Sequence, residues 1–540
     1  MSEAKIYDKG QSEYVEDVNR AGDIDQANEQ ARLDDAELIA GEATEKLTGF
    51  VYFLSITAAI SGFCFGYDTG VISASLVSIG DDLGHYLNNT EKEWISSGTS
   101  VGALMGALVG GSLADRIGRK WVLAVGDACF VVGAIIICAG FSVAQVIVGR
   151  IVLGWGVGIA AAVAPLYIGE LSPTRFRGAL VTIQSIAITG GQFFSYCIGV
   201  PLTGQHGWRI QFAIGVVPAL MQAAAIHFLP ESPRYSLLKG RREQARLTLD
   251  RSYSSMSSRY IDLKFAALEE NVKISARLVE STTLWQRWKM VLTHGPYRRP
   301  AITALGIGIF QQLCGFNTLM YYSATIFAMA GFDNPTATGL IVSGTNLFFT
   351  IVAMFLLDRV GKRRILLCTQ PGMVAGLALA AVAFAKMTAD TGGKLIEGQD
   401  YPKNWSNMML GMMVVFIAFY ATGSGNITWQ CAELFPLELR GMGSAILAGG
   451  VWAANIVISA TFLTIMEHVG AAGAFGIYAG ICALGFIFIY FFYLEVSGLS
   501  LEEVQECYKH GFGIRKSKEI RAAHRLAYKE RDEQAAHGPL

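Results

Sequence analysis

The chain has 540 residues, of which 52% are hydrophobic and 16% are charged, and its formal net charge is −1 at pH 7. Soluble domains carry about 25% charged residues, so this composition excludes a string of ordinary soluble domains and indicates a membrane protein. A net charge near zero without a clustered basic surface gives no reason to expect a nucleic-acid partner. The nine cysteines include no C-x-x-C pair, which argues against a disulfide framework and against a zinc or other metal site.

Apolar stretches of about 20 residues are long enough to cross a bilayer, and they cross it as helices because lipid offers no hydrogen bonds to the backbone. The sequence predicts twelve such spans, at 50–75, 96–114, 121–140, 144–167, 180–201, 210–229, 301–325, 336–357, 365–387, 407–430, 442–465 and 471–493. They divide into an N-terminal six-helix bundle at 49–229 and a C-terminal six-helix bundle at 301–494. The predicted fold class is therefore an all-α membrane protein.

About seventy residues, 230–300, separate the two bundles. They are rich in Arg, Lys and Glu and contain short amphipathic runs, so they are too charged for a span and too long for a hairpin. We expect a small cytoplasmic helical linker domain here.

The charges of the short loops orient the spans. Basic residues follow the second, fourth, eighth and tenth spans, whereas the loops on the other side are acidic or nearly uncharged. By the positive-inside rule the basic side is cytoplasmic, and an even number of spans puts both termini there. We therefore expect a multi-pass protein of the plasma membrane with solvated cytoplasmic tails at 1–48 and 495–540. Two N-x-S/T sequons, at Asn88 and Asn404, fall in outer loops where glycosylation is possible.

The two halves repeat the same loop motifs. D-R-I-G-R-K at 115–120 matches D-R-V-G-K-R at 358–363, and E-L-S-P…R-G at 170–178 matches E-L-F-P…R-G at 433–441. Duplicated bundles of six helices are typical of transporters that bind a substrate between the halves and open to each side in turn. We expect the charged residues of these motifs to pair across the cytoplasmic face and to latch the halves while the cavity faces outward. They are Asp115, Arg116, Arg119, Glu170, Arg177, Asp358, Arg359, Glu433 and Arg440.

Two ionisable residues lie inside predicted spans, Asp68 in the first and Arg150 in the fourth. A charge in hydrocarbon is costly and by default marks a functional site with a partner, so we predict that these two pair. If the pairing depends on conformation, Asp68 binds a proton on the outside, releases Arg150, and loses the proton on the inside. A static buried ion pair is the alternative.

Several motifs, taken in order, resemble the sugar porter family of the major facilitator superfamily. They include GYDTGVI at 66–72, GRIVLGWGVG at 149–158, PESPR at 230–234 and QQLCGFN at 311–317, and the resemblance covers roughly residues 50–510. Segments such as ITGGQF, IVSGTN and GNITWQCAELF look most like proton-coupled myo-inositol transporters, especially fungal ones. The resemblance implies the twelve-helix major facilitator fold, with Asp68 as the proton acceptor and Arg150 as its counter-ion.

The resemblance also implies a substrate site. A polyol needs several hydrogen-bond partners at once, and side-chain amides offer both donors and an acceptor. The residues that match sugar-contact positions of the family are Gln192, Gln311, Gln312, Asn317, Asn346, Trp429 and Gln430. Amide contacts that only join helices are the alternative. Tyr321 and Tyr322 are candidates for the outer gate. The chain departs from the family pattern at Ser185, at Val451 and along 425–428, and these changes disfavour ordinary glucose recognition.

Together with the repeat and the buried charges, the resemblance implies proton-coupled symport of myo-inositol or a similar polyol, and we expect a monomer in the bilayer. The proton is the coupling ion, and no cofactor is expected. A hexose or pentose symporter or facilitator is one alternative, and a sugar receptor that does not transport is another. The sequence contains no nucleophile–base constellation and no metal-ligand spacing, so we do not expect an enzyme.

Overall fold

The computed structural model describes residues 34–536, apart from 35–36, 39, 43, 205, 282, 397, 436–438, 500 and the side chains of a few helical residues. Within this part, all regular secondary structure is helical. Most of the predicted N-terminal tail, 1–48, lies outside the described residues.

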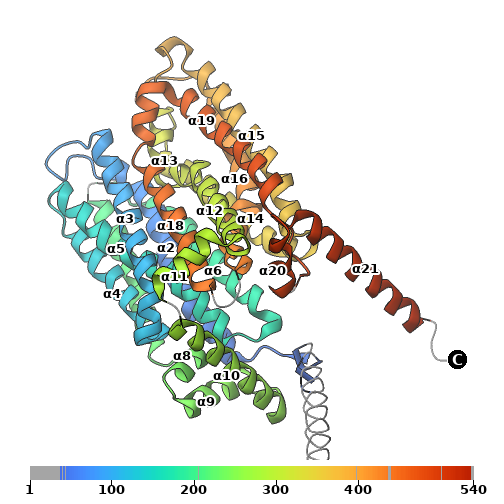
Figure 1. Cartoon of the computed structure of the whole chain (residues 1–540). Helices are drawn as coiled ribbons and strands as arrows, with labels where there is room; N and C mark the ends of the chain where they lie inside the picture. The colour runs from blue at the N-terminus through green and yellow to red at the C-terminus, as the bar shows by residue number, and fades with distance from the viewer. Residues whose placement is uncertain are drawn as a thin grey trace, which may run out of the picture.

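The N-terminal half consists of six long helices (Figure 1), which lie together on the blue-to-green side of the molecule. They are α2 (Gly49–Ser78), α3 (Asn89–Ile117), α4 (Arg119–Cys138), α5 (Val143–Leu171), α6 (Arg177–Gly199) and α7 (Gly207–Ile226). The short turn η1 (Thr174–Phe176) precedes α6.

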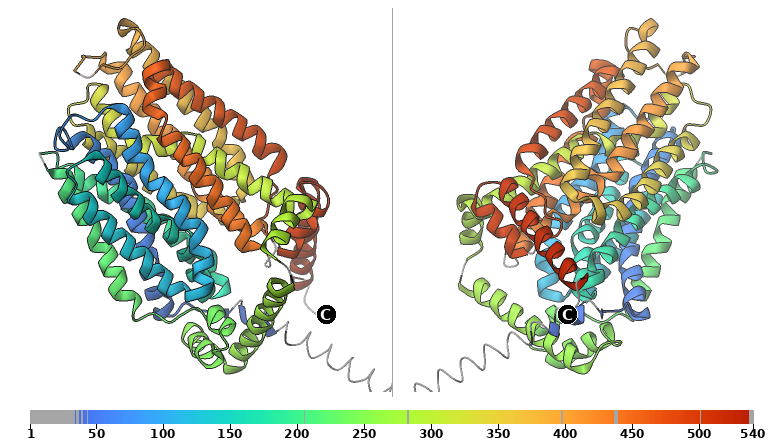
Figure 2. Two further views of the ribbon diagram at one scale, coloured as in Figure 1. Left: turned by 60° about the vertical axis from the view of Figure 1, so that its left-hand side comes forward. Right: turned by 90° about the vertical axis from the view of Figure 1, so that its right-hand side faces the viewer.

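The C-terminal half packs beside it as a second bundle, drawn from yellow to red (Figure 2). Its elements are α12 (Gly295–Leu313), α13 (Phe316–Met329), α14 (Pro335–Val360), α15 (Lys362–Met387), α16 (Lys403–Thr422), α17 (Ser424–Ile427), η3 (Thr428–Leu434), α18 (Arg440–Ser459) and α19 (Phe462–Phe492). The turn η2 (Ala389–Thr391) lies between α15 and α16.

Eleven helices of the described chain are long and apolar enough to cross a membrane. They correspond to all the predicted spans except 180–201, which is α6. This helix falls short in hydropathy because Gln184, Ser185, Thr189 and Gln192 interrupt its apolar residues. It is nevertheless part of the N-terminal bundle, because its backbone packs directly against that of α2. The contact is so close that a Cβ on Gly66 of α2 would fall 1.8 Å from the carbonyl oxygen of Ile188 on α6.

Two predicted spans are broken rather than continuous. The seventh, 301–325, divides into α12 and α13 at Gly315, whose φ of +86° is in the left-handed region that favours glycine. The tenth, 407–430, divides at Gly423, and Asn426 Nδ2 donates to the carbonyl oxygen of Ala421 at 2.7 Å. That bond satisfies a backbone group which the break releases from the helix.

The boundary between the last two spans was also predicted wrongly. The eleventh span was expected at 442–465, but α18 ends at Ser459 and a new helix, α19, begins at Phe462. A kink at Gly470, with φ of +80°, separates the first turns of α19 from the part that matches the expected span 471–493. Apolar composition continues through this turn, so hydropathy alone could not locate it.

Residues 230–294 form four helices, α8 (Pro233–Leu238), α9 (Arg242–Ser252), α10 (Ser258–Ser281) and α11 (Leu284–Thr293), and α12 already begins at Gly295. The first three lie below the bundles in Figure 1, whereas α11 lies higher, near the start of α12. The end of the N-terminal tail docks onto them, because the buried carboxylate of Glu45 accepts hydrogen bonds from Tyr260 Oη at 2.6 Å and from the backbone N–H of Arg175 at 2.9 Å. We refer to this end of the molecule as the linker side, and to the end with the α2–α3 and α18–α19 turns as the hairpin side.

The C-terminal tail was expected to be solvated throughout, and this is wrong for its first helix. After α20 (Leu501–Lys509) the chain continues as α21 (Ile514–Ala536). Cys507 and Tyr508 of α20 are fully buried, and Gln505 Nε2 donates to the carbonyl oxygen of Leu434 at 3.0 Å. The tail as a whole is rich in charged residues, so its composition did not indicate that α20 has one apolar face, which packs on the C-terminal half.

Candidate functional site

A cavity lies between the two halves. Its walls are formed by Phe65, Ser185, Ile188, Thr189, Gln192, Gln311, Gln312, Phe316, Asn317, Asn346, Thr350, Tyr420, Ala421, Gly425, Asn426, Trp429, Val451, Trp452 and Asn455. Amides, hydroxyls and aromatic rings dominate this set, and none of these lining residues carries a formal charge. Such a surface suits an uncharged molecule with many hydroxyl groups.

The amides of α12 and α13 form a connected chain in the wall of the cavity. Gln311 Nε2 donates to Tyr420 Oη at 2.6 Å, and Gln312 Nε2 donates to Gln311 Oε1 at 2.7 Å. Asn317 Nδ2 donates to Gln312 Oε1 at 2.5 Å. The break at Gly315 allows Asn317 to turn back toward the two glutamines. Each amide is therefore oriented by its neighbour before a substrate binds.

Residues of the other walls meet across the two halves. Asn346 Nδ2 on α14 donates to Gln192 Oε1 on α6 at 2.7 Å. The rings of Phe65 on α2 and Trp452 on α18 lie 5.6 Å apart between centroids and supply an apolar surface. The cavity thus combines donors and acceptors with aromatic faces, as a polyol requires.

Six of the seven predicted substrate residues line this cavity, but Gln430 does not. It follows Trp429 in η3, and successive residues of a 3₁₀-helix point about 120° apart. Because Trp429 faces the cavity, Gln430 is turned away from it. Sequence reasoning missed Thr189, Thr350, Tyr420, Asn426 and Asn455. Helical spacing was an available signal for two of them, since Thr350 and Asn455 lie one turn beyond Asn346 and Val451.

Asp68 and Arg150 form an ion pair inside the N-terminal half. Their side chains are 4% and 0% exposed respectively. The Arg150 guanidinium also donates through Nε to the carbonyl oxygen of Ile95 at 3.1 Å and lies 5.9 Å from the ring centroid of Phe212. Its Nη2 has no hydrogen-bond partner among the described residues. The structure therefore brings the two predicted partners together.

Neither member of this pair lines the cavity. The predicted gate residue Tyr321 does contact the cavity wall, because its hydroxyl accepts a hydrogen bond of 3.5 Å from Asn455, a cavity residue.

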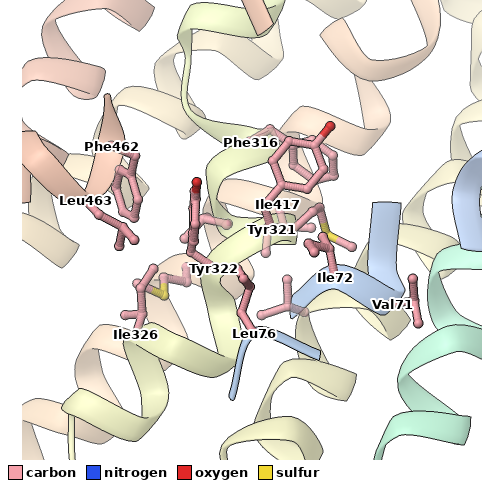
Figure 3. Packing of buried hydrophobic residues seen from close by; sticks show 14 of the residues in the cluster. Val71, Ile72, Leu76, Phe316, Tyr321, Tyr322, Ile326, Ile417, Phe462 and Leu463 are labelled. Atoms are coloured by element: carbon pink, nitrogen blue, oxygen red, sulfur yellow. The ribbon is translucent and has the colours of Figure 1, made fainter. Parts of the chain in front are cut away.

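The hairpin side of the cavity is closed by contacts between the halves. Ser73 Oγ on α2 lies 3.1 Å from Ser323 Oγ on α13 and accepts a hydrogen bond of 3.0 Å from the backbone N–H of Ala324. Tyr196 Oη on α6 donates to the carbonyl oxygen of Met320 at 2.9 Å. The predicted gate residues Tyr321 and Tyr322 are buried in this layer (Figure 3).

The motif charges on the linker side pair within each half rather than between the halves. Arg119 binds Glu170 at 3.1 Å and Asp115 at 3.0 Å in the N-terminal half, and Lys362 binds Glu433 at 2.6 Å in the C-terminal half. Arg116, Arg177 and Arg359 are exposed, and the side chains of Asp358 and Arg440 lie outside the described part of the chain. The described pairs therefore do not join the two halves across the linker side. The latch was expected only while the cavity faces outward, and in this structure the contacts between the halves lie on the hairpin side instead.

Two carboxylates that sequence reasoning missed occupy equivalent positions in the repeat. Glu231 Oε1 accepts a hydrogen bond of 2.9 Å from the backbone N–H of Arg119, at the start of α4. Glu495 Oε2 accepts one of 3.1 Å from the backbone N–H of Arg363, at the start of α15. In both halves a glutamate from the end of the bundle caps the helix that follows the D-R-x-G motif.

The predicted glycosylation sites, Asn88 and Asn404, are both exposed and lie on the hairpin side. Asn88 Oδ1 caps α3 by accepting from the backbone N–H of Glu91 at 2.8 Å. Glycosylation of these residues stays a prediction.

Two six-helix halves around an uncharged polar cavity define a multi-pass membrane transporter of the major facilitator type. The family described as "Sugar (and other) transporter" matches residues 54–508, so the chain belongs to this family. It is 71% identical over 503 residues to Myo-inositol transporter 1A of Cryptococcus neoformans var. grubii serotype A, covering 93% of this chain and 89% of that protein. It is 40% identical over 480 residues to Myo-inositol transporter 1 of Saccharomyces cerevisiae, covering 88% and 82%.

The solved structures of the xylose transporter XylE from E. coli are similar in fold. The partially occluded inward open conformation matches with a TM-score of 0.68 and 26% identity, covering 84% of this chain and all of that chain. The proton:xylose symporter XylE bound to 6-bromo-6-deoxy-D-glucose matches with a TM-score of 0.70 and 25% identity, covering 86% and 100%. These matches confirm the major facilitator fold that the family resemblance implied.

Proposed function

We propose that this protein carries myo-inositol, or a similar polyol, across the membrane together with a proton by alternating access. The observation that carries the proposal is the cavity between the halves, whose lining is rich in amides and hydroxyls and has no charged residue. The names of the relatives, myo-inositol transporters of two fungi, support the choice of substrate. Since Ser185 and Val451 line the cavity, the departures from the usual family pattern fall where they affect substrate recognition.

The linker side is cytoplasmic in this proposal, and both termini lie there, as the basic loops of that side indicate. The protein acts in the plasma membrane. The contacts of Ser73, Tyr196 and Ser323 close the hairpin side, so the structure represents the inward-facing state. The outward-facing state breaks these contacts and forms the cytoplasmic latch from the motif charges.

Proton coupling follows from the Asp68–Arg150 pair. In the outward-facing state Asp68 accepts a proton, which frees Arg150 from its counter-ion and favours closure around the substrate. In the inward-facing state the proton leaves to the cytoplasm and the ion pair forms again. A membrane potential of about 100 mV contributes ~2.3 kcal/mol per charge and each pH unit contributes ~1.4 kcal/mol. With a gradient of about two pH units, the membrane potential and the pH gradient together supply ~5 kcal/mol per proton. A tenfold concentration ratio costs roughly 1.4 kcal/mol, so this driving force supports more than a thousandfold accumulation of substrate.

We further propose that the transporter works as a monomer in the lipid bilayer, without catalytic activity and without a cofactor besides the coupling proton.

Uptake of labelled myo-inositol into proteoliposomes, compared with glucose and xylitol and repeated with a protonophore, tests the function. We expect myo-inositol to accumulate above equilibrium when the outside is acidic, and the protonophore to abolish accumulation. Preference for glucose would assign a hexose symporter instead. Equilibration without accumulation would assign a facilitator, and binding without uptake would assign a receptor.

A further inference from the structure

The N-terminus of α19 lacks a cap from its own sequence. The first N–H groups of a helix have no partner within the helix and need an acceptor from elsewhere. The residue in the N-cap position, Thr461, makes no side-chain cap hydrogen bond. Its hydroxyl instead donates to the carbonyl oxygen of Val457 at 2.7 Å, in the preceding helix α18. The start of α19 therefore depends on an acceptor from another part of the molecule.

Glu93, on α3 of the opposite half, supplies that acceptor. Its Oε1 accepts a hydrogen bond of 2.8 Å from the backbone N–H of Thr464, and its Oε2 accepts one of 2.7 Å from the hydroxyl of Thr464. Glu93 is 3% exposed, so these are the partners of a buried carboxylate rather than of a solvated surface charge. A negative charge at this position also interacts favourably with the dipole of α19.

A weaker contact accompanies this one on the same two helices. Asn89 Nδ2 donates to Glu467 Oε2 at 3.0 Å. Asn89 precedes Glu93 by one turn of α3, and Glu467 follows Thr464 by one turn of α19. Asn89 is exposed, so water competes with this bond, and the buried Glu93 contact carries more of the stabilisation.

The turn held by Glu93 also holds the predicted gate residue Tyr322. Tyr322 Oη donates to the carbonyl oxygen of Ser459 at 2.7 Å, at the end of α18. Its ring stacks on Phe462 with centroids 5.5 Å apart, and Figure 3 shows Tyr322 facing Phe462 and Leu463. The α18–α19 turn thus lies between α13, which closes the cavity, and α3 of the opposite half.

We propose that Glu93 is the outer latch of the transporter, a cap supplied by one half to a helix of the other. The cap stabilises the inward-facing state and must break each time the outer gate opens, because α3 and α19 belong to halves that move apart. The outer latch rests on the alternating access proposed above but not on the identity of the substrate or the coupling ion.

Distance measurements between spin labels on the outer ends of the two halves test this proposal directly. Tyr86 and Ile396 are exposed on the two halves and accept labels as Tyr86→Cys and Ile396→Cys, with the exposed Cys197 and Cys368 replaced by serine. In Glu93→Ala, we expect the ratio of inward-facing to outward-facing protein to fall about tenfold, which corresponds to ~1.4 kcal/mol. This size is typical of a lost helix cap.

Three further variants make the test specific. Thr464→Val keeps the backbone N–H but removes the hydroxyl, so we expect a smaller shift in the same direction. Glu93→Ala combined with Thr464→Val should shift the ratio by less than the two single effects together, because both act on one contact. Glu91→Ala is the matched control, since Glu91 pairs with His85 and Asn88 within its own half, and we expect no shift.

An unchanged distance distribution in folded Glu93→Ala would overturn the proposal, and so would an equal shift in Glu91→Ala. The melting temperature of each variant reports whether it is folded. If Glu93→Ala does not fold, Glu93→Gln and Thr464→Val decide the question, because the glutamine keeps one acceptor. Since the measurement requires no substrate and no pH gradient, a failure of polyol transport or of proton coupling leaves its outcome intact.

Discussion

The side-chain amide of Asn346 binds the side-chain carbonyl of Gln192 across the two halves, at a distance of 2.7 Å. Both residues line the cavity and both are almost completely buried. A substrate hydroxyl between them would exchange this bond for two new ones, so the same groups join the halves and recognise the ligand. A ligand shifts a conformational equilibrium only through a difference in its contacts between the two states, and this pair provides such a difference.

Asn346→Ala should weaken substrate binding by about tenfold or more, since a substrate hydroxyl that would bind Asn346 is left without a partner in the complex, which costs ~1–3 kcal/mol. Binding of labelled substrate to purified protein measures the effect. Gln430→Ala is the matched control, because Gln430 belongs to the same set of predicted residues but does not line the cavity. Equal losses in the two variants would mean that the cavity is not the binding site.

Asp68→Asn should abolish accumulation of substrate against its gradient while exchange of internal for external substrate continues. The amide cannot carry the coupling proton, but the cavity stays intact. Proteoliposome uptake with an imposed pH gradient measures the first property, and counterflow measures the second. Asp127→Asn alters another buried carboxylate, on α4, and we expect it to accumulate substrate normally. Full accumulation by Asp68→Asn would show that the pair is a static structural element.

Asp82, in the loop between α2 and α3, should make stability depend on pH. Burial acts to raise the pKa of Asp82, but hydrogen bonds from Trp208 at 2.9 Å and from His206 at 2.7 Å outweigh it and lower the pKa. A lowered pKa in the folded state adds stability above the unfolded value of about 3.9, and this stability is lost as pH falls through the folded pKa. The melting temperatures of wild type and Asp82→Asn should therefore differ at pH 7 and converge below about pH 4.

The exposed neighbour Asp81 provides the control for this measurement. Asp81→Asn should melt like the wild type at pH 7. A difference between wild type and Asp82→Asn that stays constant over the whole range would assign the effect to packing rather than to charge.

Gly118→Ala and Gly361→Ala should each destabilise the protein. The two glycines have φ of +103° and +99°, and a Cβ would fall 2.2 Å from Glu231 Oε2 or 2.7 Å from Glu495 Oε2. Backbone strain in this region amounts to ~1–3 kcal/mol, and the clash also displaces the carboxylate that caps the next helix. The melting temperature measures the loss. Gly111→Ala, where a Cβ meets no atom within 4 Å, should not lower it.

The helical architecture was accessible from the sequence because crossing a bilayer is a local requirement. A stretch such as 144–167 must be apolar and helical whatever it packs against, and it corresponds to α5, Val143–Leu171. The repeated motifs predicted the two halves for a similar reason, since each motif ends a helix at the same place in each bundle. Polar residues within spans, such as Asp68 and Gln311, were recognisable as candidates because lipid disfavours them.

Which of these candidates meet was decided by the tertiary structure. Gln192 and Asn346 are 154 residues apart, and their contact depends on the rotation and tilt of two helices that composition does not fix. Trp429 faces the cavity, but its neighbour Gln430 points away, because successive residues of a 3₁₀-helix are about 120° apart around the axis. In the sequence Glu93 lies in an acidic segment just before the predicted span 96–114, yet in the structure it is buried and its carboxylate accepts a hydrogen bond from the start of a helix in the other half. Hydropathy constrains each segment against lipid, whereas such contacts between distant segments exist only once the helices have packed.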